Sequence, residues 1–332
     1  MKMTGESREI EQTRISIWKR IRSMKEFSVL VILLALVVFI SIMSPAFLTV
    51  TNLRTTAIGF SCNAIIAIAM TLALVSGGFD LSVGSVLGLS SVCVVVLSNS
   101  GLNIWLACIA GIVAGVFCGA VNGLLIGYLN LNAFITTLGM QQMARGIVYV
   151  LTNGGSIGVQ DAPGVEAFRF IGSGSFGSVP TLVVVCLILV VIGDVMVRRS
   201  GAARNVFFVG SNEKTAMLSG INTRMVKTMV YVLTGTLSGL AGVLTASRFG
   251  TATSSTGDGV EMTVISAAVI GGVSLSGGKG TVAGAVLGVI MMSVISNILV
   301  ILSVSVHWQN FITGAILILA IIFDVLSNRK KN

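Results

Sequence analysis

Hydrophobic residues follow one another in long runs that are separated by short polar or glycine-rich stretches. Most of these runs approach the roughly 20 residues that a helix needs to cross a bilayer. The pattern therefore predicts an all-α polytopic membrane protein with about ten transmembrane helices. The third and eighth runs are short and bounded by glycine, which makes them candidates for tilted or re-entrant segments. The runs are residues 27–44, 57–76, 80–98, 103–127, 132–151, 181–197, 226–248, 259–275, 281–302 and 309–326.

Basic residues indicate which side of the membrane each loop faces. Of the 21 Lys and Arg residues, 16 lie in residues 1–26, 198–227 and 329–331. Loops rich in Lys and Arg stay in the cytoplasm, and an even number of spans returns the chain to its starting side. We therefore predict a cytoplasmic loop at 198–227 and cytoplasmic N- and C-termini. The predicted parts are a basic N-terminal segment at 1–26, a transmembrane domain at 27–326 with an external loop at 152–180, and a tail at 327–332.

The composition agrees with a membrane protein and excludes other classes. Hydrophobic residues make up 54% of the chain and charged residues only 10%, whereas about a quarter of a soluble globular protein is charged. The net charge of +9 does not indicate nucleic-acid binding, because most of the cations flank apolar runs. The five cysteines lie in apolar stretches without Cys-x-x-Cys spacing, so neither a disulfide framework nor a metal site is predicted.

Two short segments indicate an internal repeat. Asp80–Ser85 aligns with Glu261–Ser266 in the order acid, apolar, hydroxyl, valine, any residue, serine. The predicted topology puts Asp80 near the cytoplasmic face and Glu261 near the outer face, so the two segments run in opposite directions. This pattern predicts an inverted repeat, from which many transporters build a central pathway. Glycines at helical spacing, such as Gly111, Gly115 and Gly119, predict close helix packing within the bundle or, alternatively, a dimer face.

Four ionisable residues within the predicted spans are candidates for a transport pathway, because a charge there is costly unless it faces a cavity or a partner. Asp194 lies one turn before Arg198, so a local ion pair explains it. Arg145 is predicted to pair with a carboxylate in the bundle or to face a pathway. Asp80 and Glu261 are predicted as helix caps, gate hinges or ligand contacts. The candidate gate or pathway residues are Gly77, Gly78, Asp80, Ser82, Arg145 and Glu261.

The basic loop contains a short predicted helix. Asn212 is placed to cap its start, Glu213 is favourable at its positive end and Gly220 is placed to end it. A stiff helix at the membrane face can transmit force from a partner protein. The alternative is a solvated loop whose cations only fix the topology.

Four motifs carry a resemblance to a known family. They are GGFDLSVGS at 77–85, TLGMQQMARG at 137–146, VGSNEKTAMLSGI at 209–221 and VISAAVIGGVSLSGGKGTVAGAVLG at 264–288. From about residue 28 to 326, the chain resembles the permease subunits of ribose-type carbohydrate ABC importers, which are proteins of the bacterial inner membrane. The resemblance implies a type II-like importer fold that works with a second permease copy or paralogue, a cytoplasmic ABC ATPase and an extracytoplasmic sugar-binding protein.

The resemblance also gives the short helix a role. It implies that Glu213–Gly220 is the coupling helix that docks into a groove of the ATPase, with Ala216, Met217, Leu218 and Gly220 as contact residues and Asn212 and Glu213 at its start. Family members commonly carry two alanines where this chain has Thr215 and Ala216.

The chain itself is not predicted to be an enzyme. The segment that most resembles a phosphate-binding loop is Gly271–Thr281. It has Gly280 after Lys279, where a magnesium-binding Ser or Thr is required. ATP and Mg²⁺ are therefore expected on the partner ATPase, and no cofactor on this chain. Gly154–Gly158 matches the Gly-x-Ser-x-Gly pattern of esterases, but no layered α/β domain fits around it.

The predicted function is ATP-driven import of a small sugar by alternating access, the substrate being ribose, a related pentose or hexose, or a sugar-like signal. The alternatives are an ABC permease for a branched-chain amino acid or a nucleoside, and an ion-coupled secondary carrier. Coupling to ions requires titratable residues at mid-span, whereas the acids here are predicted near span ends.

Overall fold

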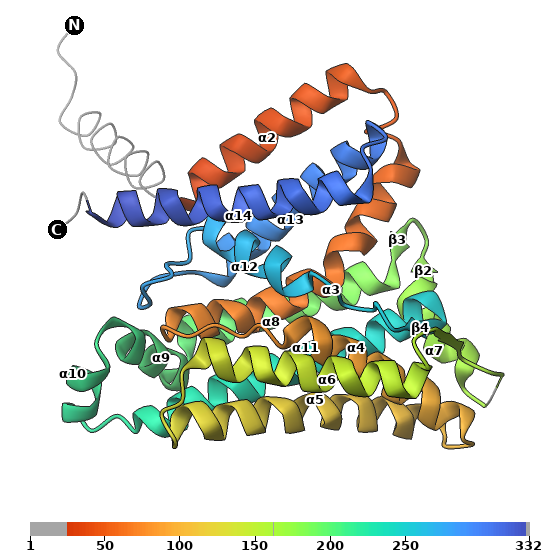
Figure 1. Cartoon of the computed structure of the whole chain (residues 1–332). Helices are drawn as coiled ribbons and strands as arrows, with labels where there is room; N and C mark the ends of the chain where they lie inside the picture. The colour runs from red at the N-terminus through yellow and green to blue at the C-terminus, as the bar shows by residue number, and fades with distance from the viewer. Residues whose placement is uncertain (1–24, 162, 330–332) are drawn as a thin grey trace, which may run out of the picture.

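The computed structural model describes residues 25–161 and 163–329 (Figure 1). Over these residues the chain forms thirteen helices and four short strands. The predicted segment 1–26 lies outside the described residues except for Lys25 and Glu26, and the predicted tail is described only to Arg329. The helices are α2 (Lys25–Met43), α3 (Val50–Val75), α4 (Val83–Asn99), α5 (Ile104–Gly127), α6 (Ala133–Thr152), α7 (Val165–Ser173), α8 (Thr181–Arg199), α9 (Gly201–Ser211), α10 (Glu213–Leu218), α11 (Thr223–Phe249), α12 (Val260–Ile270), α13 (Val282–Ile301) and α14 (Val306–Arg329).

The long hydrophobic runs fold as helices. Each predicted segment overlaps one helix, and these helices are α2 to α6, α8 and α11 to α14. Within the described residues, six helices are long and apolar enough to cross a membrane: α2, α3, α5, α8, α11 and α13. Helices α4 and α12 are apolar but shorter, while α6 carries Gln141, Gln142 and Arg145 along its 20 residues. The chain is thus a multi-pass membrane protein.

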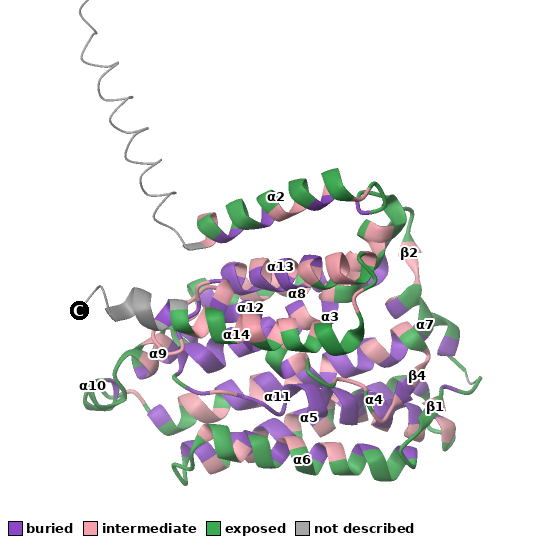
Figure 2. Ribbon diagram, turned by 45° about the horizontal axis from the view of Figure 1, so that its top comes forward, coloured by how far each residue is buried: buried purple, intermediate pink, exposed green. Residues whose placement is uncertain are grey.

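Helix α3 lies at the centre of the bundle, and its second half, Ser61–Val75, is almost entirely buried. Helices α4, α5, α6 and α11 lie on one side of it, and α2, α12, α13 and α14 on the other (Figure 1). Exposed residues collect on the outer faces of α2, α6 and α14, while buried residues fill the middle of the bundle (Figure 2). The exposed large side chains of these outer faces are mainly apolar, as expected for a surface in contact with lipid.

Helices α5 and α11 pack backbone to backbone through their glycines. A Cβ atom added to Gly115 would collide with the carbonyl oxygen of Gly235 and lie 2.8 Å from the Cα of Gly239. A Cβ on Gly119 would lie 3.1 Å from the Cα of Gly235. Small residues permit this close approach in membranes, where the bulk hydrophobic effect does not drive helices together. The predicted role of the α5 glycines in packing within the bundle is confirmed.

The two ends of the bundle carry different structures (Figure 1). Helices α9 and α10 lie at one end, which we call the α9–α10 end. At the opposite end, the α7 end, lie α7 and two small antiparallel sheets. One sheet pairs β1 (Ser156–Gly158) with β4 (Thr251–Thr253), and the other pairs β2 (Ser175–Phe176) with β3 (Val179–Pro180). The predicted external loop therefore contains a nine-residue helix and three short strands.

Candidate functional site

Helix α12 begins inside the bundle. It has 11 residues, which is about 16 Å at about 1.5 Å per residue, half the roughly 30 Å thickness of a hydrocarbon core. The chain reaches its first turn from β4, at the α7 end, through the non-helical residues 254–259. Gln141, in the middle of α6, donates a hydrogen bond of 3.1 Å to Glu261 in that first turn. Residues 254–259 therefore descend into the bundle, and α12 continues toward the α9–α10 end.

Helix α4 also begins inside the bundle, but its chain enters from the other end. Residues 76–82 lead inward from the end of α3, and the Tyr231 hydroxyl, two turns inside α11, donates to the Phe79 carbonyl oxygen at 3.2 Å. The starts of the two helices touch, because a Cβ on Gly84 would collide with Glu261 Oε2 and with the carbonyl oxygen of Gly257. Discontinuous helices that begin beside each other inside a membrane protein form binding sites in many transporters.

The structure corrects the predicted depth of Glu261. The sequence places this residue near the outer face, but it lies against the middle of α6, 94% buried. The prediction is wrong because residues 254–259 form turns rather than a helix and carry the chain inward before α12 starts. The argument that span acids lie near span ends therefore fails for Glu261.

Asp80 organises the start of α4. Its side chain is 1% exposed. One carboxylate oxygen accepts hydrogen bonds from the backbone NH of Ser82 at 3.0 Å and from the Ser82 hydroxyl at 2.6 Å, and the other accepts from the Thr234 hydroxyl of α11. Asn122 of α5 donates to the Ser82 hydroxyl at 3.0 Å. Asp80 and Ser82 thus join three helices, and their burial favours a positioning role over contact with a solute.

We expect Asp80→Ala to lower the free energy of unfolding by about 3 kcal/mol, because it leaves two buried donors, the backbone NH and the hydroxyl of Ser82, without their acceptor. Chemical unfolding of the purified protein in detergent measures the change. Asp194→Ala is the matched control: Asp194 pairs with Arg198 at 2.6 Å at the accessible end of α8, as predicted, and such pairs contribute less than about 1 kcal/mol. Equal losses in the two variants would contradict the role of Asp80.

Arg145 holds the descending segment against α6. Its guanidinium donates to the carbonyl oxygens of Ser254 at 3.0 Å and Thr256 at 2.8 Å, and it forms a 2.7 Å ion pair with Asp258. The prediction that Arg145 pairs with a carboxylate is confirmed. Asp258 was not among the predicted site residues; its distance of 113 positions from Arg145 in the sequence hides the pairing.

The same region carries polar groups that the protein does not fully satisfy. Glu261 Oε2 is buried and has no hydrogen-bond partner among the described residues. Asp258, which pairs with Arg145, is about half exposed, and Gln142, one turn before Arg145, is exposed although it sits halfway along α6. Polar groups at this depth normally face a water-filled cavity or a partner rather than lipid.

The loop before Asp80 lies beside the predicted coupling region. Gly77 and Gly78 line a pocket of about 520 Å³ together with Asn212, Glu213 and Lys227. Any side chain on Gly78 would collide with the Tyr231 hydroxyl, so this loop requires glycine there. The pocket places the segment that leads to α4 next to the start of α10.

Helix α10 forms where the sequence predicts it. The Asn212 side chain accepts a hydrogen bond from the backbone NH of Thr215 at 2.9 Å, which caps the helix. Glu213 forms a 2.6 Å ion pair with Lys227 of α11. Gly220 ends the segment with φ of +83°, a conformation that favours glycine. Thus α10 is a capped helix tied to a long helix of the bundle.

The side chains of α10 divide into two groups. Ala216 is 4% exposed and packs inward, whereas Met217 is 59% and Leu218 is 86% exposed. Of the apolar contact residues that the resemblance implies, Met217 and Leu218 have exposed side chains that a partner could contact. Ala216 instead packs against the rest of the protein.

Apolar helices, helices that begin inside the bundle and a protruding surface helix define a membrane transport protein. Comparison with known proteins identifies its family: residues 52–321 match the model described as branched-chain amino acid transport system, permease component. The chain belongs to this family of transport permeases. No solved structure matches it.

Individual relatives match almost the whole chain. It is 36% identical to the ribose import permease protein RbsC of Bacillus subtilis, over 99% of this chain and all of the relative. It is 34% identical to the Escherichia coli (strain K12) protein of the same name, over 91% of this chain and 93% of the relative. It is 33% identical to the L-arabinose ABC transporter permease protein AraH of Azospirillum brasilense, over 94% and 90%. The resemblance found in the sequence motifs is confirmed.

Proposed function

We propose that this chain is the transmembrane permease subunit of an ABC importer for a small sugar, such as ribose or a related pentose or hexose. The observation that carries the proposal is the similarity, over at least nine-tenths of the chain, to permeases named for ribose and for L-arabinose. The family description favours a second candidate substrate, a branched-chain amino acid. The chain would have a type II-like fold of ten spans in the bacterial inner membrane, with its termini and the α9–α10 end in the cytoplasm.

The proposed pathway lies where α4 and α12 begin. The chain reaches these two helix starts from opposite ends of the bundle, which is the arrangement expected of an inverted repeat. Asp258, Gln142 and the free oxygen of Glu261 provide acceptors and donors for the hydroxyl groups of a sugar. Arg145 and Asp80 position the two helix starts. Alternating access would move these starts relative to each other as the two permease copies, or a copy and a paralogue, rock against one another.

The proposed energy source is a separate ABC ATPase that binds ATP and Mg²⁺. It would dock on α10 through Met217 and Leu218, whose exposed apolar side chains suit a groove on a partner. The Glu213–Lys227 ion pair and the pocket shared with Gly77 and Gly78 connect α10 to the start of α4. At the opposite end, α7 and the β2–β3 hairpin, with Phe176 61% exposed, would receive the sugar-binding protein.

The proposal is tested by reconstituting the chain with its ATPase and binding protein in liposomes and measuring uptake of labelled ribose, arabinose, glucose and leucine. We expect uptake of a sugar that requires ATP and all three proteins. Uptake of leucine but of no sugar would contradict the sugar substrate and favour an amino-acid importer. ATP-independent uptake through this chain without its partners would contradict the ABC importer and favour an ion-coupled carrier.

A further inference from the structure

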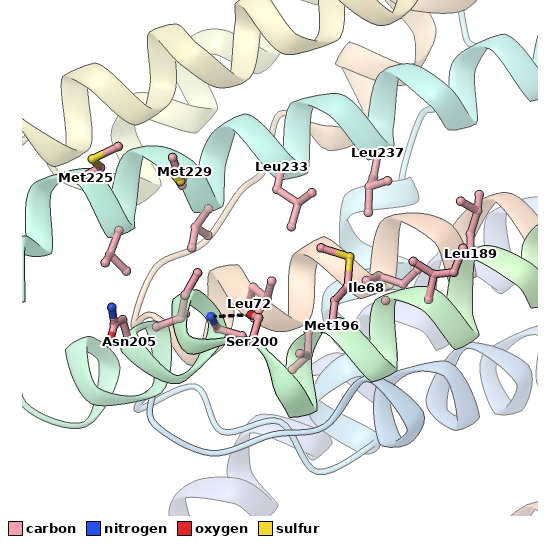
Figure 3. Close-up of a pocket in the computed structure, with 18 of the residues that line it drawn as sticks. Ile68, Leu72, Leu189, Met196, Ser200, Asn205, Met225, Met229, Leu233 and Leu237 are labelled. Atoms are coloured by element: carbon pink, nitrogen blue, oxygen red, sulfur yellow. Dashed lines mark hydrogen bonds between the residues drawn. The ribbon is translucent and has the colours of Figure 1, made fainter.

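An apolar groove lies between α8 and α11, with α3 as its floor and α9 at one end (Figure 3). Met225, Met229, Leu233 and Leu237 of α11 face Leu189 and Met196 of α8 across it. Its volume is about 550 Å³. Three residues that line it, Met196, Met225 and Met229, are 48% to 60% exposed. The groove is therefore accessible from the lipid phase and is separate from the proposed pathway, none of whose residues lines it.

The length of the groove corresponds to one leaflet of a bilayer. Met225 and Leu237 are twelve residues apart, or about 18 Å along a helix, and one leaflet contributes half of a hydrocarbon core of about 30 Å. The length of the groove and its apolar lining therefore match one acyl chain that extends through one leaflet.

The lining becomes polar at the α9–α10 end. Ser200, Asn205 and Asn222 line the groove there. Each lies next to or within two residues of an exposed arginine, and these arginines are Arg199, Arg204 and Arg224. Among the described residues, none of the three forms an ion pair. The nearby acids do not neutralise them, because Asp194 is paired with Arg198 and Glu213 with Lys227.

We propose that this groove binds an anionic phospholipid, with one acyl chain in the apolar part and the phosphate headgroup at Arg199, Arg204 and Arg224. Basic pockets between transmembrane helices bind acidic headgroups in this way. A zwitterionic lipid would fill the apolar part but would gain much less from the three unpaired cations. The bound lipid would contact α9, the helix that leads directly into α10.

The test uses the purified full-length chain with Leu233→Trp, in nanodiscs of phosphatidylcholine that contain brominated phosphatidylglycerol or, separately, brominated phosphatidylcholine. Bromine quenches tryptophan at contact distance, and the parent chain gives the background from native tryptophans. We expect stronger quenching by the brominated phosphatidylglycerol at equal mole fraction. Arg204→Gln should reduce this preference about fivefold, as expected for one arginine at an anionic headgroup. Lys214→Gln, at the same end but outside the groove, is the matched control and should leave it unchanged.

Equal quenching by the two brominated lipids would overturn the anionic specificity. Absence of quenching would show that lipid does not occupy the groove, and a disulfide between two copies that carry Leu233→Cys would identify a second chain as its occupant. A fivefold loss in the Lys214→Gln control would show that the preference reflects general surface charge and would also overturn the proposal. If Leu233→Trp does not fold, Met229→Trp places the reporter in the same groove.

Discussion

Replacing Gly115 with alanine is expected to destabilise the bundle by about 2 kcal/mol or more, as overpacking of a tight interface does. The added methyl group would collide with the carbonyl oxygen of Gly235 and lie 2.8 Å from the Cα of Gly239. Both atoms belong to the backbone of α11, so no side chain can turn aside. The collision can be removed only if α5 and α11 move apart. These two helices form the largest interface between helices of the described chain. Thermal unfolding in detergent, followed by loss of the monodisperse species, measures the effect.

The same substitution at Gly139 provides a control with the opposite expected sign. Gly139 lies in α6, and a Cβ there would have no atom within 4 Å. Alanine favours a helix over glycine by up to about 1 kcal/mol, so Gly139→Ala should leave stability unchanged or raise it. A loss of stability in Gly139→Ala as large as that in Gly115→Ala would show that the close contact between α5 and α11 is not the cause.

Replacing Leu218 with aspartate is expected to uncouple the transporter while leaving the chain folded. Leu218 is 86% exposed, so a charge there costs the isolated permease little. In the proposed complex it would enter an apolar site on the ATPase, where loss of a central contact costs about 2 kcal/mol, roughly a 30-fold loss of affinity. Co-purification of the ATPase and ATP-dependent sugar uptake measure the two consequences.

Leu102→Asp is the matched control for Leu218→Asp. Leu102 is 37% exposed in the loop between α4 and α5, at the α7 end. We expect this variant to retain the ATPase, because its charge lies at the opposite end of the bundle from α10. Wild-type ATPase binding and uptake in Leu218→Asp would remove α10 from the proposed docking site.

Local sequence signals predict the elements that depend on local interactions. The cap residue Asn212, the acid Glu213 and the terminating Gly220 are enough to predict α10, because each acts within one or two turns. The long apolar runs likewise predict where the bundle helices lie. The segment 259–275 is predicted too long, since α12 ends at Ile270, before Gly271 and Gly272. Gly272 has φ of +94°, which a helix does not permit.

The arrangement of the candidate site depends on contacts that the sequence does not reveal. Asp80 was predicted as a cap, but its partner Thr234 is 154 positions away and sits within an ordinary helical run. The depth of Glu261 depends on the direction of residues 254–259, and no periodic pattern encodes that direction. The exposed polar residues Gln142 and Asp258 become informative only when it is known that Gln142 lies halfway along α6 and that Asp258 pairs with Arg145 of the same helix. Sequence analysis thus finds the acids but not what surrounds them.

The arrangement also indicates how force from α10 would reach the pathway. Glu213 ties α10 to α11, and α11 supplies Tyr231 and Thr234 to the segment that contains Asp80. Gly84, one turn after Asp80, touches Glu261 at the start of α12. A displacement of α11 would therefore act on the starts of both α4 and α12.

The central claim, that the transport pathway lies where α4 and α12 begin, is tested most directly by thiol labelling. Gln142→Cys and Met262→Cys place a thiol beside Arg145 and beside Glu261, and Ile188→Cys places one on the exposed apolar face of α8. The five native cysteines are buried or half-buried, so their background is small. In the assembled transporter, we predict that a membrane-impermeant reagent labels the first two positions at rates that change with ATP, and does not label Ile188→Cys. Gln142→Cys and Met262→Cys as unreactive as Ile188→Cys would contradict the claim.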